Sequence, residues 1–130
     1  MLKSRNAFSM IELVFVIVVL GILAAIAVPK FAATRDDAKI AAARATIGAV
    51  RSGIVSERQK RLLKGDSTYI GSLGSGFENV LSYPATGWSG STTTYTTTIV
   101  GQTCTFDYNS TSGKFLYNTS NNAVCAPLNF

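Results

Sequence analysis

The residues Phe8 to Val28 read FSMIELVFVIVVLGILAAIAV, and this stretch decides the architecture of the chain. Glu12 is the only charged residue among these 21. A helix rises about 1.5 Å per residue, so the stretch would be roughly 30 Å long, which matches the hydrocarbon thickness of a bilayer. We therefore expect a membrane-spanning helix over residues 8–29, preceded by a short basic segment, residues 1–7.

The helical pattern continues beyond Pro29. Residues 30–64 are rich in alanine and charged side chains and contain no proline. Apolar residues recur in steps of three and four, the spacing of one helical face: Ile40, Ala43, Ile47, Val50 and Ile54. Because a proline inside a long helix can bend it without ending it, we expect an amphipathic continuation over 30–64. Gly65 is a suitable stop signal.

From Gly65 onward the composition shifts to Gly, Ser, Thr, Asn and aromatic residues. Three stretches have the alternation or composition of strands: Thr92–Val100, Thr103–Tyr108 and Lys114–Tyr117. Turns at Gly101-Gln102 and Asn109–Gly113 would join them, after an irregular connection over Tyr69–Gly90. The sequence thus predicts an α+β fold in which a three-stranded antiparallel meander packs on the amphipathic helix.

Composition argues against an enzyme. The chain has 130 residues, of which 47% are hydrophobic and 15% charged, so we expect one small folded domain besides the apolar helix. It contains no histidine, which removes the commonest general base, the Ser-His and Cys-His pairs and every His-containing zinc site. Two cysteines cannot form a four-thiolate metal site. We expect no catalytic residue, no metal and no cofactor.

The positive charge is concentrated in the helix. The formal net charge is +5, and residues 30–64 hold nine basic and three acidic side chains. We interpret these charges as a solvated helix face, or as partners for acidic neighbours in an assembly. Clustered Lys and Arg also attract phosphates, so nucleic acid binding stays open as the lesser alternative, and DNA is not predicted as a partner.

Glu12 is the residue that needs an explanation. An unpaired carboxylate near the middle of a bilayer costs on the order of 2–4 kcal/mol, and less near an end. Glu12 could be hydrated at the interface, be protonated, or pair with a cation. No Lys or Arg lies within the apolar stretch, so a cation would come from another chain or from a newly created terminal amine.

The residues Ala7-Phe8-Ser9-Met10-Ile11-Glu12-Leu13, with Gly21 and Pro29 further on, resemble the processing signal of type IV pilins and type II secretion pseudopilins. The shared features are a short basic leader, a small residue before Phe8, and Glu12 as the fifth residue counted from Phe8. Gly21 follows nine residues after Glu12, and Pro29 eight after Gly21. Ala7 departs from the family, which usually has glycine there.

The resemblance implies a role for each of these residues. A prepilin peptidase would remove the leader, residues 1–7, by cutting between Ala7 and Phe8, and would methylate the new amine of Phe8. Glu12 would receive that amine from an adjacent subunit, and Gly21 and Pro29 belong to the same assembly segment. The implied partners are further copies of the chain, other pilin-like subunits, the peptidase, and an inner-membrane assembly platform with its ATPase.

The family often closes its carboxy-terminal loop with a disulfide, which here would join Cys104 to Cys125. Closing about 20 residues in this way stabilises a chain by about 3 kcal/mol, and it requires an oxidising compartment. Residues 65–130 would then form a globular region in the periplasm of a single-pass inner-membrane protein. Two reduced, buried thiols are the alternative. The basic residues after the apolar stretch, four against two before it, would instead place this region in the cytoplasm.

Two interpretations compete for the function. The resemblance implies a structural subunit that polymerises through its N-terminal helix into a pilus or pseudopilus, supporting secretion, adhesion or DNA uptake. The alternative is a monomeric periplasmic binding domain that is membrane-anchored or secreted. Secretion would use Ala25-Ile26-Ala27 as an ordinary signal cleavage site and release a chain that begins at Val28.

Overall fold

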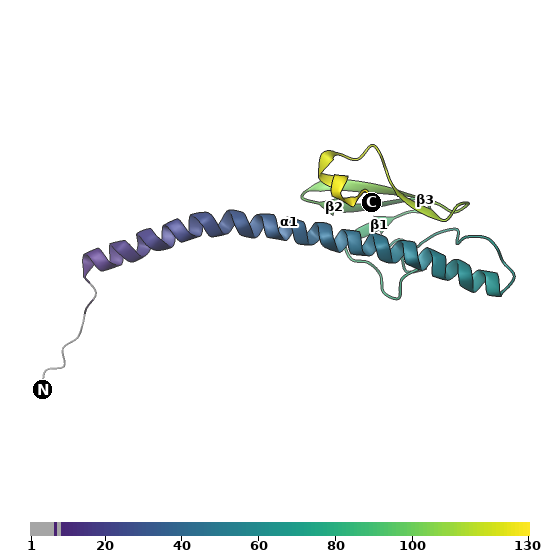
Figure 1. Cartoon of the computed structure of the whole chain (residues 1–130), viewed down its shortest axis with the longest axis horizontal. Helices are drawn as coiled ribbons and strands as arrows, with labels where there is room; N and C mark the ends of the chain where they lie inside the picture. Colours follow the sequence, from purple (N-terminus) through teal and green to yellow (C-terminus); the bar gives the residue numbers. More distant parts are fainter. Residues whose placement is uncertain (1–6, 8) are drawn as a thin grey trace, which may run out of the picture. The chain divides into compact units, whose positions relative to one another are not determined.

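The computed structural model describes Ala7 and residues 9–130 (Figure 1). The chain divides into two compact units: the first ends at Arg35, and the second is Asp36–Phe130. One long helix contributes to both units, and the second unit adds four strands and a short 3-10 helix. In chain order the elements are α1 (Met10–Leu63), β1 (Trp88–Gly90), β2 (Thr94–Ile99), β3 (Gln102–Asn109), β4 (Lys114–Tyr117) and η1 (Ala123–Leu128).

Helix α1 confirms the long helical spine. Pro29 lies inside the helix and does not end it. After Leu63 the N–H of Gly65 donates to the carbonyl of Leu62 and the N–H of Asp66 donates to that of Arg61, at N···O distances of 3.0 and 2.9 Å. Gly65 has a φ of 86°, so these two bonds form the glycine-dependent C-cap that satisfies the last carbonyls. The sequence prediction of a stop at Gly65 is confirmed.

The sheet is antiparallel with the order β1-β2-β3-β4, so its strands follow one another as a meander. The three predicted strands are present, although β2 is shorter than predicted. The fourth, β1, falls in the stretch that we expected to be irregular, so that expectation is wrong there. It pairs Trp88 with Thr97 and Gly90 with Tyr95. Only three residues long, β1 is too short to show the alternation by which a strand is recognised in a sequence.

The turn between β2 and β3 also differs from the prediction. Val100 and Gly101 form it, rather than Gly101-Gln102, and both have positive φ values, 49° and 73°. Two successive residues with positive φ match the right-handed twist of a hairpin, which favours this turn geometry in two-residue loops. The valine at the first position hides the turn from a sequence search, because such turns normally carry Asn, Asp or Gly there.

The core of the second unit lies between α1 and the inner face of the sheet. Ala43, Ile47, Val50 and Ile54 of α1 are buried, as their spacing predicted. They meet side chains that alternate inward along the strands: Tyr95, Ile99, Cys104, Phe106, Tyr108 and Phe115. Each large apolar side chain buried in this way stabilises the fold by about 1.5–3 kcal/mol. The α+β architecture, a helix packed on a small antiparallel sheet, is therefore confirmed.

The connection between α1 and β1 contributes Phe77 to this core. Its ring is fully buried, with centroids 4.9 Å from Tyr95, 5.3 Å from Trp88 and 5.6 Å from Phe115. Phe77 has a φ of 64°, which is strained for an aromatic residue. The next residue holds the strained loop in place, because the carboxylate of Glu78 accepts hydrogen bonds from the N–H groups of Gly76 and Ser75, at 2.7 and 3.2 Å.

Gly113, in the turn between β3 and β4, provides a test of packing. Its φ is 68°, and a Cβ there would overlap the ring of Tyr69. We expect Gly113→Ala to lower the free energy of unfolding by about 3 kcal/mol or more. The strain of a positive φ in alanine and the overlap of its Cβ with the Tyr69 ring both destabilise the folded state, and the two effects add. Gly101→Ala is the matched control: its φ is 73°, and in the part of the chain that the structure describes nothing other than its sequence neighbours lies within 4 Å of the new Cβ. At Gly101 only the strain of the backbone would lower the free energy of unfolding, by about 1–2 kcal/mol. Equal losses would contradict the packing argument. Urea unfolding of the full chain in detergent, followed through the single tryptophan, measures both.

Glu78 predicts a dependence of stability on pH. Hydrogen bonds from its own backbone N–H and from that of Gly76 hold the pKa of its carboxyl below the ordinary value of 4.5. A lowered pKa in the folded state stabilises the fold above about pH 4.5, and this contribution is lost as pH falls through the folded-state value.

The difference in unfolding free energy between the natural chain and Glu78→Gln should therefore be largest at pH 7 and shrink below about pH 4.5. Urea unfolding at a series of pH values measures it. A difference as large at pH 3 as at pH 7 would contradict the assignment.

Candidate assembly site

The carboxylate of Glu12 caps the start of α1. One of its oxygens, Oε2, accepts hydrogen bonds from the backbone N–H of Ser9 at 2.8 Å and from the Ser9 hydroxyl at 3.2 Å. In return the Ser9 hydroxyl oxygen lies 3.3 Å from the Glu12 backbone nitrogen and accepts its N–H. This reciprocal arrangement is a capping box, in which Ser9 is the N-cap and Glu12 the third helical residue.

Ser9 is thus a functional neighbour of Glu12 that our sequence analysis missed. The signal was available, because Ser-x-x-Glu before an apolar run is the pattern of a capping box. Its consequence is electrostatic: the N-terminal end of a helix carries partial positive charge, which favours a carboxylate. Glu12 therefore has a structural role within its own chain besides the pairing role implied by the resemblance.

Beyond the cap, the first unit presents an apolar helix surface. By length and composition α1 can cross a membrane, and none of its most apolar 18-residue window is buried in the structure. Ile11, Phe15 and Leu20 are examples, with exposed fractions of 77, 69 and 58%. A continuous apolar surface of this kind needs lipid or other protein to cover it.

The remaining predicted assembly residues lie along this unit. Among the described residues, nothing beyond the adjacent residues and the nearby backbone of the helix lies within 4 Å of a Cβ built at Gly21, so packing within the chain does not require a glycine there. Pro29 is exposed within α1, and Ala7 is exposed before it. Phe8, at which cleavage and methylation are expected, lies outside the described residues.

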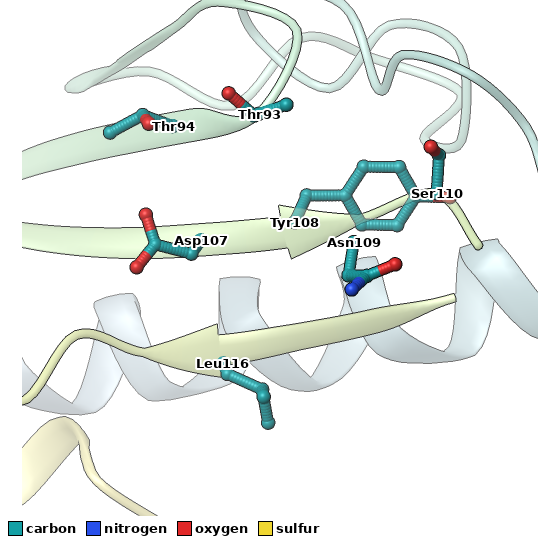
Figure 2. Close-up of a pocket in the computed structure, with 7 residues that line it drawn as sticks. All are labelled: Thr93, Thr94, Asp107, Tyr108, Asn109, Ser110 and Leu116. Atoms are coloured by element: carbon teal, nitrogen blue, oxygen red, sulfur yellow. The ribbon is translucent and has the colours of Figure 1, made fainter. Parts of the chain in front are cut away.

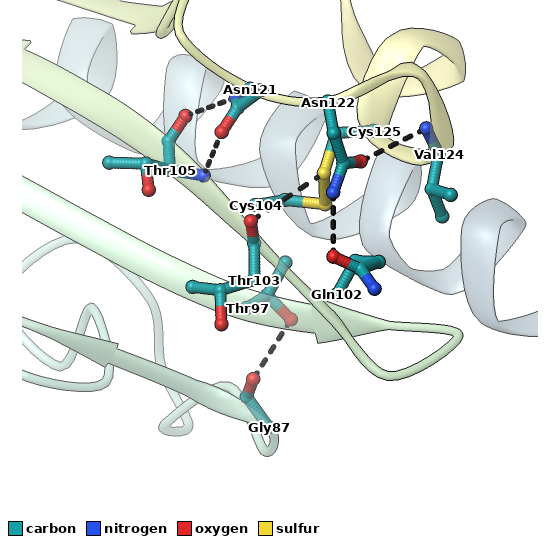
Figure 3. Close-up of a disulfide and its surroundings, with 10 residues drawn as sticks. All are labelled: Gly87, Thr97, Gln102, Thr103, Cys104, Thr105, Asn121, Asn122, Val124 and Cys125. Atoms are coloured by element: carbon teal, nitrogen blue, oxygen red, sulfur yellow. Dashed lines mark hydrogen bonds between the residues drawn. A yellow bond between two sulfur atoms is a disulfide. The ribbon is translucent and has the colours of Figure 1, made fainter.

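In the second unit, the predicted disulfide is present (Figure 3). It joins Cys104 of β3 to Cys125 of η1, and both residues are fully buried. Polar contacts fix the loop before η1. Asn121 exchanges two hydrogen bonds of 2.7 Å with the backbone of Thr105, and the Asn122 side chain donates to Gln102 at 2.8 Å. The segment that closes the fold is thus attached to β3 both covalently and by hydrogen bonds.

Two arginines of α1 attach the last residues from the other side. Arg44 Nη1 donates to the carbonyl of Pro127 at 3.0 Å, and Arg51 Nη1 donates to that of Phe130 at 2.7 Å. Both guanidinium groups stack on the Phe130 ring, with Cζ 4.5 and 5.0 Å from its centroid. Arg51 Nε also donates to the carbonyl of Phe115, on the outer edge of β4, at 3.2 Å.

The basic face of α1 is therefore only partly the solvated face that we expected. Arg58 likewise turns inward, stacking on the Tyr69 ring at 4.2 Å and donating to its hydroxyl at 2.6 Å. These internal contacts were beyond sequence analysis, because the groups that accept from the arginines are backbone carbonyls and rings far away in the chain. They also reduce the number of cations available to a polyanion such as DNA.

Comparison with known proteins agrees with the N-terminal motif. Residues 2–28 match the family model of the prokaryotic N-terminal methylation motif. The chain is 53% identical over 47 residues to the major component of the type IV narrow pilus of Thermus thermophilus. It is 36% identical over 52 residues to core protein G of the type II secretion system of Pseudomonas aeruginosa. These matches confirm the resemblance to type IV pilins and pseudopilins.

The extent of these matches is limited. They cover 36 and 40% of this chain, and 40 and 37% of the two relatives. No solved structure matches the chain significantly. The comparisons therefore support the N-terminal motif and the class of protein.

Arg51 provides a test of the attachment of the last residues. We expect Arg51→Met to lower the free energy of unfolding by about 1–3 kcal/mol, because the part-buried oxygen of Phe115 and the exposed backbone oxygen of Phe130 both lose their donor. Lys60→Met is the control. The Lys60 side chain is 68% exposed, so the change should stay within about 0.5 kcal/mol. Equal effects in urea unfolding would show that the arginine contributes no more than an ordinary surface residue.

Proposed function

We propose that this chain is a structural subunit of a type IV pilus or a type II secretion pseudopilus. The observation that carries the proposal is a lone carboxylate, Glu12, at the start of an exposed apolar helix that carries the N-terminal methylation motif. In this proposal the chain is not an enzyme, and its function lies in polymerisation through α1, supporting protein secretion, adhesion or DNA uptake.

Glu12 would control the register of assembly. Cleavage between Ala7 and Phe8 would create an amine next to the capping box, and an adjacent subunit would present the same amine to Glu12. An unpaired charge in hydrocarbon is costly, whereas a paired and hydrogen-bonded one is tolerated. A subunit shifted along the filament would leave both groups unpaired, so the pairing favours one axial position. Gly21 and Pro29 would serve the same helix contacts.

The proposal also assigns a location. The leader, residues 1–7, would be removed by a prepilin peptidase, and residues 8–29 would span the inner membrane until an assembly platform and its ATPase extract the subunit. The second unit would lie in the periplasm, where the Cys104–Cys125 disulfide can form. Other pilin-like subunits would join the same filament.

The mass of the mature protein tests the processing step. A chain that begins at a methylated Phe8 supports the proposal. A chain that begins at Val28 would instead indicate an ordinary secretory signal, and the N-terminal helix would then be absent from the mature protein. Intact-mass spectrometry of protein purified from its native membrane distinguishes the two masses.

Replacement of Glu12 tests the assembly step. We expect Glu12→Ala to insert into the membrane normally but to reduce filament yield at least tenfold, because loss of a favourable pair worth about 1.4 kcal/mol or more changes an equilibrium by that factor. Asp37→Ala, which removes an exposed acidic residue of the same helix, should leave the yield unchanged. The measurement is the amount of chain in sheared filaments.

The competing function is a monomeric, membrane-anchored binding domain. Crosslinking in intact membranes separates it from the proposal, because a filament subunit gives a ladder of multimers and a monomer gives none. A normal filament yield from Glu12→Ala would contradict the pairing role but would leave filament formation itself intact.

A further inference from the structure

An acidic groove crosses the outer face of the sheet. Thr94, Asp107 and Leu116 are cross-strand partners on β2, β3 and β4, and all three are exposed (Figure 2). They lie on the face opposite the buried Tyr95 and Phe106, so they point away from the core. Together with Thr93, Tyr108, Asn109 and Ser110 they line a groove in which Asp107 is the charged residue.

The carboxylate of Asp107 is positioned but not neutralised. Asn118 Nδ2 donates to its Oδ2 at 2.7 Å. The ion pairs found within the described part of the chain involve Glu57 and Asp66, and none involves Asp107. The groove thus has the chemistry to receive a basic side chain, with the carboxylate for an ammonium group and Leu116 for its aliphatic stem.

The same unit has one matching cation at its other end. Most basic side chains of residues 36–130 have a hydrogen-bond or ion-pair partner within the chain: Arg44, Arg51, Arg58, Lys60 and Arg61. Lys64 and Lys114 are exposed, but both lie toward the end that carries the acidic groove. Lys114 of β4 lies opposite Asn109 of β3 in the register of the sheet, and Lys64 directly follows the last residue of α1. Among the described residues of this unit, Lys39 is the exposed basic residue that has no such partner and lies away from the acidic groove.

Lys39 is exposed and lines a second groove, with Trp88, Thr98 and Ile99. Thr98 and Ile99 end β2, whereas Thr94, which lines the acidic groove, begins it. Five residues of a strand span roughly 17 Å, which is more than twice the length of an extended lysine side chain. An ion pair between Lys39 and Asp107 of one chain is therefore excluded, and the pair can form only between two copies.

We propose that Lys39 of one copy docks in the Asp107 groove of the next copy. The two surfaces are different and lie at opposite ends of β2, so the contact is heterologous. A heterologous contact that does not close into a ring builds an open filament. The inference rests on the proposed function and deepens it, because it names a contact between the globular units, separate from the pairing of Glu12. Its partner is a second copy of this chain.

Charge exchange tests the contact in cells that assemble the full chain. We expect Lys39→Asp and Asp107→Lys each to reduce the amount of sheared filament about tenfold or more, because each places like charges opposite one another. Combining both changes in one chain restores the opposite charges at every contact and should return the yield to within about threefold of the natural chain. Lys64→Asp, with the same change in net charge as Lys39→Asp, should leave the yield unaltered.

A zero-length carbodiimide crosslink provides a second readout that does not depend on variants. Treating sheared filaments should join the Lys39 amine to the Asp107 carboxylate, and mass spectrometry of the digest identifies the joined peptides. Absence of this crosslink from filaments, normal yield from both single variants, or failure of the double exchange to restore the yield would each overturn the proposal.

The two proposals fail in different ways. If the natural chain forms no filaments and no multimer ladder, the proposed function itself is wrong and the contact is wrong with it. If filaments form but the crosslink is missing or the exchange has no effect, the proposed function stands and only the Lys39–Asp107 contact is lost.

Discussion

The contact between one face of α1 and the inner face of the sheet supports the whole unit Asp36–Phe130. Ile47, Val50 and Ile54 are almost completely excluded from solvent, and no other helix of this length is available in the described chain to cover the strands. A sheet of four short strands buries too little surface to be stable without such a cover. The helix in turn needs the sheet, because an isolated amphipathic face would remain in water.

The two parts of α1 differ in what covers their apolar side chains. In the second unit one side of the helix is covered by the chain's own strands, loops and last residues. In the described part of the first unit the most apolar stretch of the helix has no cover from the chain, and the capping box of Ser9 and Glu12 satisfies polar groups at the start of the helix. The physical requirement for lipid or for neighbouring helices therefore falls entirely on the segment that carries the methylation motif.

The segment that closes the fold is attached to the rest of the second unit by three kinds of interaction: a disulfide, apolar packing and hydrogen bonds from arginines. The disulfide joins η1 to β3, Leu128 fills the core, and Arg44 and Arg51 bind backbone carbonyls from the side of α1. A covalent link mainly restricts the unfolded chain, whereas the arginines and Leu128 act in the folded state. Among the described residues of this unit, Lys39, Lys64 and Lys114 are exposed lysines outside the ion pairs, and Lys39 lines a different groove from the one that contains Asp107.

The sequence by itself determined the features that depend on local pattern. The apolar stretch, the helical face of Ile47 and Ile54, the stop at Gly65, the alternation of Cys104, Phe106 and Tyr108 and the processing motif all follow from neighbours in the chain, because the periods of helices and strands are local properties. Only the tertiary structure decided the rest. Strand β1 exists because its three residues find a partner in β2, the Val100-Gly101 turn is set by the pairing of its flanking strands, and the arginines bind carbonyls up to 83 residues away. Contacts with backbone groups have no sequence signature, since every residue carries the same carbonyl.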